Sequence, residues 1–174
     1  MIGAGTRVAD YEIVHELSAG GHGRFYLAVP PARLGLDTDR VVVKLVAGGD
    51  DTAFRRFTRE LRLYARVDSP SLVRLFDAGQ HEDFFFYSME WCTGGSLADA
   101  GDRLSRDDKK RALSQAALAA HALHEAGIAH RDIRPGNILL RADGDAVLSD
   151  LGLAQLGTGS VTSMAPVSSI GFLP

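Results

Sequence analysis

Hydrophobic positions in the first half of the chain fall mainly into short runs separated by turns. These strand-like runs cover residues 11–17, 24–29, 40–46, 72–78 and 84–89. One helix interrupts them at 52–67, with apolar residues at helical spacing: Phe54, Phe57, Leu61 and Tyr64. Asp51 or Thr52 is its expected N-cap. The pattern predicts a sheet-rich part that contains a single helix.

A mainly helical part is expected after the turn at 93–95. Ser105 is the expected N-cap of a long helix, because Asp108 can act as its capping-box partner, and Gly127 is the expected end. Two short apolar runs, 137–140 and 146–148, bracket a turn at 143–145, as in a hairpin. From residue 157 onward glycine, serine and threonine dominate, as in a surface loop. We therefore expect an α+β domain with a ligand site between its two parts.

Composition narrows the class of protein. The chain has 174 residues, 45% of them hydrophobic, and a formal net charge of -3, so it can bury a core and has no basic surplus for nucleic acid. Cys92 is the single cysteine, which excludes a disulfide framework within the chain and fits a reducing compartment. Residues 1–10 show no signal peptide, and no apolar run is long enough for a membrane span. We expect a cytoplasmic protein without a membrane segment in this chain.

A glycine-rich stretch joins the first two predicted strands: Ser18-Ala19-Gly20-Gly21-His22-Gly23. Glycines at such a turn let backbone amides approach phosphate oxygens without an intervening side chain. A plain hairpin turn is the commoner explanation of such a stretch. It is not a Walker A loop, because no Gly-Lys-Ser/Thr follows.

Two charged residues occupy positions that the pattern assigns to buried faces. Lys44 lies inside the apolar run 41–46, and Glu60 follows Phe57 by one helical turn. Taken singly, Lys44 could extend its ammonium from an edge strand and Glu60 could pair with Arg56 on the surface. A charge that is buried without a partner costs on the order of several kcal/mol. We therefore predict an ion pair between Lys44 and Glu60.

Three polar residues lie on short turns near the predicted hairpin. Asp132 and Asn137 belong to the stretch His130-Arg131-Asp132-Ile133-Arg134-Pro135-Gly136-Asn137, and Asp150 follows the second short strand. Phosphoryl transfer needs a carboxylate that orients a hydroxyl, and an amide and a second carboxylate that hold magnesium. Turn chemistry would explain any one of the three residues. It does not explain all three in this order.

The ordered set of glycine loop, strand lysine, helix glutamate, catalytic loop and metal aspartate resembles the eukaryotic-type (Hanks-type) serine/threonine protein kinases. The resemblance runs from about Tyr11 to the last residue and implies a bilobal fold. Residues 11–90 would form an antiparallel-sheet N-lobe with one helix, and residues 91–174 a mainly helical C-lobe. Family members continue well beyond this point, so the resemblance implies a kinase domain that is incomplete at its C-terminus.

The resemblance also implies ATP and Mg²⁺ as cofactors and a protein as substrate. Gly20 and Gly23 would cover the phosphates, with Lys44 on the α- and β-phosphates, positioned by Glu60. Met89 would close the back of the adenine pocket, and Glu90 and Cys92 would offer backbone hydrogen bonds. Ser18, at the place of the first loop glycine, together with Phe25 and Val42, would complete the nucleotide site.

On the catalytic side, the resemblance implies that Asp132 accepts or orients the substrate hydroxyl proton and that Asn137 and Asp150 bind magnesium. Arg134 stands where serine/threonine kinases carry a lysine that contacts the γ-phosphate. Because its planar guanidinium differs from a lysine ammonium, the resemblance does not decide whether the acceptor residue is Ser/Thr or Tyr. Leu151 replaces the usual phenylalanine. Arg131 implies regulation by phosphorylation of the following loop, with these acceptors: Thr158, Ser160, Thr162, Ser163, Ser168 and Ser169.

Two other functions compete with a protein kinase. A pseudokinase, which binds ATP or acts as a scaffold without turnover, is favoured by Arg134 and by the short C-lobe, but the intact set of polar residues argues against it. Small-molecule kinases of the aminoglycoside type share an Asp and an Asn at similar spacing. They usually carry glycine where Arg131 stands, so this function ranks last.

Overall fold

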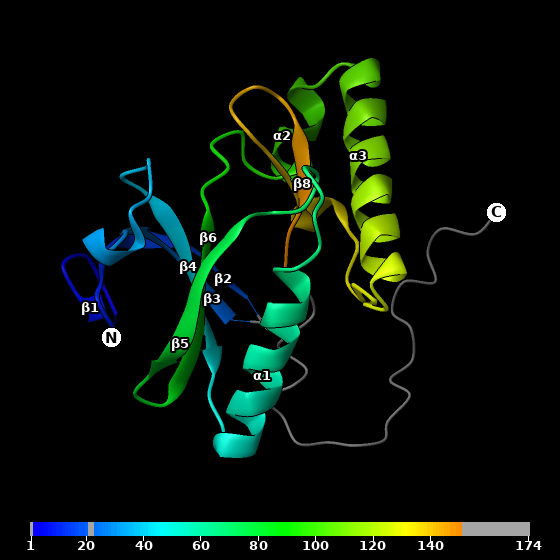
Figure 1. The fold of residues 1–174 in the computed structure, drawn as a ribbon. Helices are drawn as coiled ribbons and strands as arrows, with labels where there is room; N and C mark the ends of the chain where they lie inside the picture. Colours follow the sequence, from blue (N-terminus) through cyan, green and yellow to red (C-terminus); the bar gives the residue numbers. More distant parts are fainter. Residues whose placement is uncertain (1, 21–22, 151–174) are drawn as a thin grey trace.

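The computed structural model describes residues 2–20 and 23–150, and it has two parts (Figure 1). The first is a six-stranded antiparallel sheet in the order β1-β2-β3-β4-β6-β5. Its strands are β1 (Arg7–Val8), β2 (Tyr11–Gly20), β3 (Gly23–Val29), β4 (Val41–Ala47), β5 (Leu75–His81) and β6 (Phe84–Glu90), with a short 3₁₀ turn, η1 (Ala32–Leu34), before β4. This confirms the predicted sheet-rich lobe and adds β1 to it.

Both faces of the central strand β4 are covered, which explains why its sequence is apolar apart from Lys44. Val41, Val43 and Leu45 belong to one apolar cluster, on the face of Tyr11 and Tyr26. Val42 and Val46 belong to a second cluster, which continues into the helical part. Because side chains alternate along a strand, Lys44 points to the same face as Val42 and Val46. The lysine therefore faces the junction between the two parts.

The single helix of the first part, α1 (Asp51–Tyr64), buries Phe57, Leu61 and Tyr64. Its N-cap is Asp50, whose carboxylate accepts a hydrogen bond from the Ala53 amide at 2.8 Å. The predicted caps, Asp51 and Thr52, were wrong by one and two positions, because Asp51 instead lies in the first turn, where its charge suits the helix dipole. The predicted end at residue 67 was three residues too late.

The second part is built on one long helix and a hairpin. Its elements are α2 (Leu97–Ala100), η2 (Gly101–Arg103), α3 (Arg106–Glu125), η3 (Pro135–Asn137), β7 (Ile138–Leu140) and β8 (Ala146–Leu148). The Ser105 hydroxyl accepts a hydrogen bond from the Asp108 amide, and Gly127 has a positive φ of 74° just after the helix, so both predicted ends are confirmed. The buried side of α3 packs against β8.

The β7–β8 hairpin joins the two parts. Val73 donates its amide to the Leu148 carbonyl at 3.0 Å, and on the other side Gly94 donates to the Leu140 carbonyl at 2.9 Å. A strand was predicted at 72–78, but Leu72 bridges to Leu148 and the sheet strand begins only at residue 75. The reason is a change of partner: residues 71–73 pair with the hairpin rather than with the sheet.

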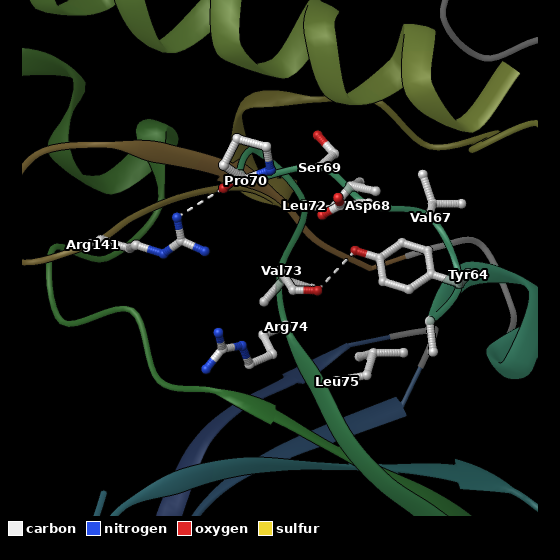
Figure 2. A pocket seen from close by; sticks show the side chains of 11 residues that line it. Tyr64, Val67, Asp68, Ser69, Pro70, Leu72, Val73, Arg74, Leu75 and Arg141 are labelled. Carbon is white, nitrogen blue, oxygen red and sulfur yellow. Dashed lines mark hydrogen bonds between the residues drawn. The ribbon is translucent and has the colours of Figure 1, made fainter. Parts of the chain in front are cut away.

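A pocket of about 300 Å³ lies at this junction (Figure 2). On one side the Tyr64 hydroxyl donates to the Val73 carbonyl at 3.1 Å, and on the other Arg141 Nη1 donates to the Pro70 carbonyl at 2.8 Å. The connection between α1 and β5 is thus held from both sides. In the part of the chain that the structure describes, no helix is long and apolar enough to cross a membrane.

Candidate active site

The described residues of the glycine-rich stretch lie in the β2–β3 ladder, where Gly20 pairs with Gly23. Gly23 has a φ of 122°, and a Cβ on it would overlap the Leu45 carbonyl oxygen and lie 3.3 Å from Lys44 Cε. Only glycine lets the hairpin approach β4 this closely. The backbone of Gly23 therefore lies directly against the predicted phosphate-binding lysine.

Lys44 is completely buried and forms an ion pair with Asp150. Its ammonium also lies over the Phe25 ring, 4.8 Å from the centroid, and near the Tyr87 ring at 5.9 Å. Burial lowers the pKa of Lys44, an effect that the negative charge of Asp150 opposes. The Tyr87 hydroxyl donates a hydrogen bond of 3.3 Å to Asp150 Oδ1. A predicted nucleotide residue and a predicted metal ligand are thus in direct contact.

The structure does not contain the predicted Lys44–Glu60 ion pair. Lys44 binds Asp150 instead, and within residues 2–20 and 23–150 Glu60 takes part in no ion pair. The helical spacing places Glu60 at the edge of the buried face, where its side chain is only half-buried and water can solvate the charge. Burial was therefore predicted correctly for the lysine and wrongly for the glutamate.

The catalytic-loop residues form a compact cluster around η3. Asn137 is 3% exposed, and its amide nitrogen donates to both the carbonyl and Oδ2 of Asp132, each at 2.8 Å. Arg134 Nε lies 3.2 Å from the same Oδ2. Asp132 Oδ1 accepts no hydrogen bond from any described residue, and the side chain is 26% exposed. One carboxylate oxygen is therefore held in place, and the other can receive a proton donor.

Ser149 ties this cluster to Asp150. Its amide donates to the Asn137 carbonyl at 2.8 Å, and its carbonyl lies 3.0 Å from His130 Nε2. His130 Nδ1 accepts a hydrogen bond from the Asp132 amide, so the ring proton must be on Nε2, which donates to Ser149. The predicted metal ligands Asn137 and Asp150 are thus fixed close together through Ser149.

The oxygens at this position suit a magnesium ion. The Asn137 amide nitrogen is engaged, which leaves its Oδ1 as a ligand, and Asp150 Oδ2 accepts no hydrogen bond from the described residues. Hard cations such as Mg²⁺ prefer such oxygen ligands, usually one or two from the protein with the rest from phosphates and water. Within the described ranges, this site included, no cluster of three or more His, Cys, Asp or Glu side chains could hold a metal ion without further ligands. The residues therefore fit a cation that shares its coordination with a nucleotide.

The predicted adenine-side residues lie on neighbouring strands. Val42 on β4 is opposite Met89 on β6, and both belong to the same apolar cluster, against which Phe25 of β3 packs. Cys92 is 7% exposed, and burial raises the pKa of its thiol to about 12. Ser18 is exposed and pairs with Phe25 in the β2–β3 ladder. Val42, Met89 and Phe25 therefore lie on the face of the sheet to which Lys44 points, and Cys92, which follows β6, belongs to the same apolar cluster.

Sequence reasoning missed three residues of this region: Tyr87, Ser149 and Arg141. Tyr87 carried a signal, since it is the one hydroxyl in a run of phenylalanines, Phe84-Phe85-Phe86-Tyr87. Ser149 acts through its backbone and through its hydroxyl, which donates to the Asn137 carbonyl at 3.1 Å, and a single serine after an apolar run gives no signal of such a partner. Arg141 lies in a turn, where an arginine is unremarkable, and its pairing with Glu90 depends on the fold. Leu151 and the candidate phosphorylation sites between residues 158 and 169 lie outside the described residues.

Comparison with known proteins agrees with this geometry. The protein kinase domain family matches residues 11–174. The serine/threonine-protein kinase PknJ of Mycobacterium tuberculosis is 34% identical, over 95% of this chain and 29% of its own length. PrkC of Bacillus subtilis, also a serine/threonine-protein kinase, is 30% identical over 86% of this chain and 24% of its own. The chain thus spans less than a third of these curated relatives.

Solved structures give the same result. The crystal structure of the Mycobacterium tuberculosis PknI kinase domain superposes with a TM-score of 0.72 and 26% identity, and the match covers 88% of this chain and 64% of that one. The fold, the motif order and the sequence relatives all lead to one family. They confirm the resemblance to the eukaryotic-type serine/threonine kinases, and this chain, which spans only part of the domain, belongs to the protein kinase family.

Proposed function

We propose that this chain is the ATP- and Mg²⁺-binding part of a protein kinase that transfers the γ-phosphate of ATP to Ser or Thr hydroxyls of protein substrates. The observation that carries the proposal is the cluster in which Asn137 holds Oδ2 of Asp132 and leaves Oδ1 open. A carboxylate fixed in this way can orient an incoming hydroxyl and accept its proton. The relatives named serine/threonine-protein kinases support the choice of acceptor.

The remaining residues would bind and orient the nucleotide. Lys44 would leave Asp150 and contact the α- and β-phosphates, while Gly20 and Gly23 bring backbone amides over them. Asn137 Oδ1 and Asp150 Oδ2 would hold magnesium, which when bound offsets the phosphate charge. Arg134, next to Asp132, would face the γ-phosphate. Met89, Val42 and the backbone of Glu90 and Cys92 would hold the adenine.

An ATP-binding scaffold without turnover is the second candidate. One observation favours it: Lys44 and Asp150 bind each other, and Glu60 does not engage the lysine. Such a pairing holds the Lys44 ammonium on a carboxylate rather than on a phosphate. The contact is between two side chains and is reversible, so it also fits a kinase whose lysine moves to the phosphates when a nucleotide binds.

A phosphotransfer assay separates the two functions. Purified protein is incubated with labelled ATP, Mg²⁺ and a generic protein substrate, and the labelled amino acid is identified. We expect label on serine or threonine for the wild type, and none for Asp132→Ala, which should still bind ATP. ATP binding without labelling by the wild type would leave only the scaffold function. Labelling that persists in Asp132→Ala would show that this carboxylate is not the catalytic one.

The proposal includes a cytoplasmic location, ATP and a protein substrate as partners, and no nucleic-acid partner. It rests on the single cysteine and the absence of a basic surplus in the sequence. Fractionation of cells that express the protein, followed by immunoblotting, tests the location. Recovery of the protein only in the membrane or extracellular fraction would contradict this part of the proposal.

A further inference from the structure

The hydroxyl of Tyr87 is buried in the core, where it contacts Asp150, a predicted metal ligand. It lies on β6 opposite Lys44 of β4, so both side chains project to the same face of the sheet. Its ring packs against Phe57 of α1, with centroids 6.3 Å apart, and the residue is 2% exposed. At the outer end of this buried ring, the hydroxyl donates to Asp150 Oδ1 at 3.3 Å.

Packing alone does not account for this hydroxyl. The neighbouring positions Phe85 and Phe86 fill the core on either face of β6 without any polar atom. A buried hydroxyl costs free energy unless it is hydrogen-bonded. Among the described residues, the Asp150 carboxylate is its partner. A phenylalanine would fill the same space, so the hydroxyl has to be explained by Asp150.

The contact uses one side of the carboxylate and leaves the other open. Lys44 and Tyr87 both bind Oδ1, whereas Oδ2 accepts no hydrogen bond from the described residues. In the proposed function, Lys44 moves its ammonium from Asp150 to the phosphates of a nucleotide. When the lysine leaves, Tyr87 is the donor among residues 2–20 and 23–150 that still fixes the rotation of this carboxylate. A hydrogen bond from outside the coordination sphere that orients a ligand typically strengthens metal binding.

From this geometry we propose that Tyr87 is a positioning residue, which holds the Asp150 carboxylate so that its second oxygen can bind the magnesium ion of the nucleotide complex. The inference rests on the proposed function, in which Asp150 is a magnesium ligand. Tyr87 touches neither substrate nor metal in this role and acts only through Asp150.

Titration calorimetry with ATP, in Mg²⁺ and separately in EDTA, tests the role without measuring turnover. Tyr87→Phe removes only the hydroxyl, and we expect it to weaken Mg²⁺·ATP binding on the order of tenfold while binding of metal-free ATP changes little. Tyr26→Phe is the matched control: this tyrosine is also buried, on the opposite face of the sheet, and its hydroxyl has no hydrogen-bond partner among the described residues. It should bind both forms of ATP like the wild type.

Asp150→Asn separates failure of this inference from failure of the proposed function. If the wild type binds ATP equally well with and without Mg²⁺, the magnesium site and the role of Tyr87 are both refuted. If Mg²⁺ strengthens binding in the wild type but not in Asp150→Asn, and Tyr87→Phe behaves like the wild type, only the role of Tyr87 is refuted. Tighter Mg²⁺·ATP binding by Tyr87→Phe would also overturn it, because the hydroxyl would then stabilise the closed Lys44–Asp150 pair instead. If Tyr87→Phe binds Mg²⁺·ATP and metal-free ATP more weakly by the same factor, the fold is damaged, and this result counts against a specific role of the hydroxyl.

Discussion

Glu90 and Arg141 form a two-pronged ion pair that joins the end of β6 to the residue after β7. Arg141 Nε lies 2.8 Å from Glu90 Oε2, and Arg141 Nη2 lies 2.7 Å from Oε1. The same Oε1 accepts the Arg74 amide at 2.8 Å, and Arg141 also donates to the Pro70 carbonyl. Three segments of the junction therefore meet at one carboxylate. Glu90 is also a predicted adenine contact, through its backbone, so the pair fixes the strand end on which that contact depends.

Arg141→Lys should destabilise the fold although it keeps the charge. A lysine ammonium cannot reproduce two parallel hydrogen bonds to Glu90 and a third to Pro70, and we expect a loss of about 1–2 kcal/mol in the free energy of unfolding. Urea denaturation measures it. Arg74→Lys is the control, because the exposed Arg74 side chain makes no hydrogen bond with the described residues and only its backbone binds Glu90. Equal midpoints for the two variants would contradict the prediction.

Gly94→Ala should be strongly destabilising, because a Cβ at this position would lie 2.7 Å from both the carbonyl oxygen and the Cβ of Leu140. The chain must then move away from the hairpin, which weakens the hydrogen bond between the Gly94 amide and Leu140. We expect a loss of roughly 2 kcal/mol or more, measured by thermal or urea unfolding. Gly101→Ala is the matched control, since nothing lies within 4 Å of its Cβ and its φ of -52° suits alanine. That variant should keep or slightly gain stability.

The stability of the protein should fall when His130 becomes protonated. Burial lowers the pKa of His130 below its ordinary value of 6.5, and the hydrogen bond to the Ser149 carbonyl offsets this only in part. Because the unfolded chain then binds a proton more readily than the folded one, the free energy of unfolding decreases as the pH falls below about 6.5. Above that pH both states are neutral at this residue and the effect vanishes.

Comparison of His130→Gln with His121→Gln isolates this effect. His121 is exposed on α3, so its variant should keep the wild-type dependence of stability on pH. We expect a shallower decrease for His130→Gln between about pH 7.5 and 5.5, whatever its absolute stability. Urea midpoints across this range provide the measurement. Parallel curves for all three proteins would mean that His130 does not titrate differently in the folded state.

The sequence was most informative where a local rule decides the structure. The cap at Ser105, the end of α3 near Gly127 and the two hairpin strands depend on residues close in the chain. All were predicted, although the first strand, predicted at 137–140, begins at residue 138 because Asn137 belongs to η3. At the start of α1 the local rule alone did not identify the capping residue. Asp50 and Asp51 are equally good capping residues, and only the path of the backbone out of β4 decides between them.

Long-range choices of partner were the part that sequence reasoning could not predict. Lys44 was correctly placed on a buried face, but Glu60 and Asp150 are both carboxylates, and the residue type cannot tell which one the lysine selects. The same holds for Leu72 and Val73, whose apolar pattern fits a strand but whose partner proved to be β8. In both cases the residue type fixed the burial and the tertiary structure fixed the partner.

The buried Lys44–Asp150 pair should behave as one unit in a double-mutant cycle. Lys44→Met or Asp150→Asn alone leaves its partner buried and unpaired, and each should cost about 3 kcal/mol of unfolding free energy or more. The double variant removes both charges, so its loss should be smaller than the sum of the single losses by at least about 1 kcal/mol. Unfolding in urea without nucleotide gives all the values required.

The exposed pair of Asp107 and Lys110 on α3 provides the matched control cycle, because its nitrogen and oxygen are 3.3 Å apart but 62% and 91% of the lysine and aspartate side chains are exposed. Solvent screens such a pair, so Lys110→Met and Asp107→Asn should be additive within about 0.3 kcal/mol. Additive losses at Lys44 and Asp150 as well would mean that the lysine spends little time on this carboxylate in solution. The groups predicted to receive the phosphates and the metal would then already be separated before a nucleotide binds.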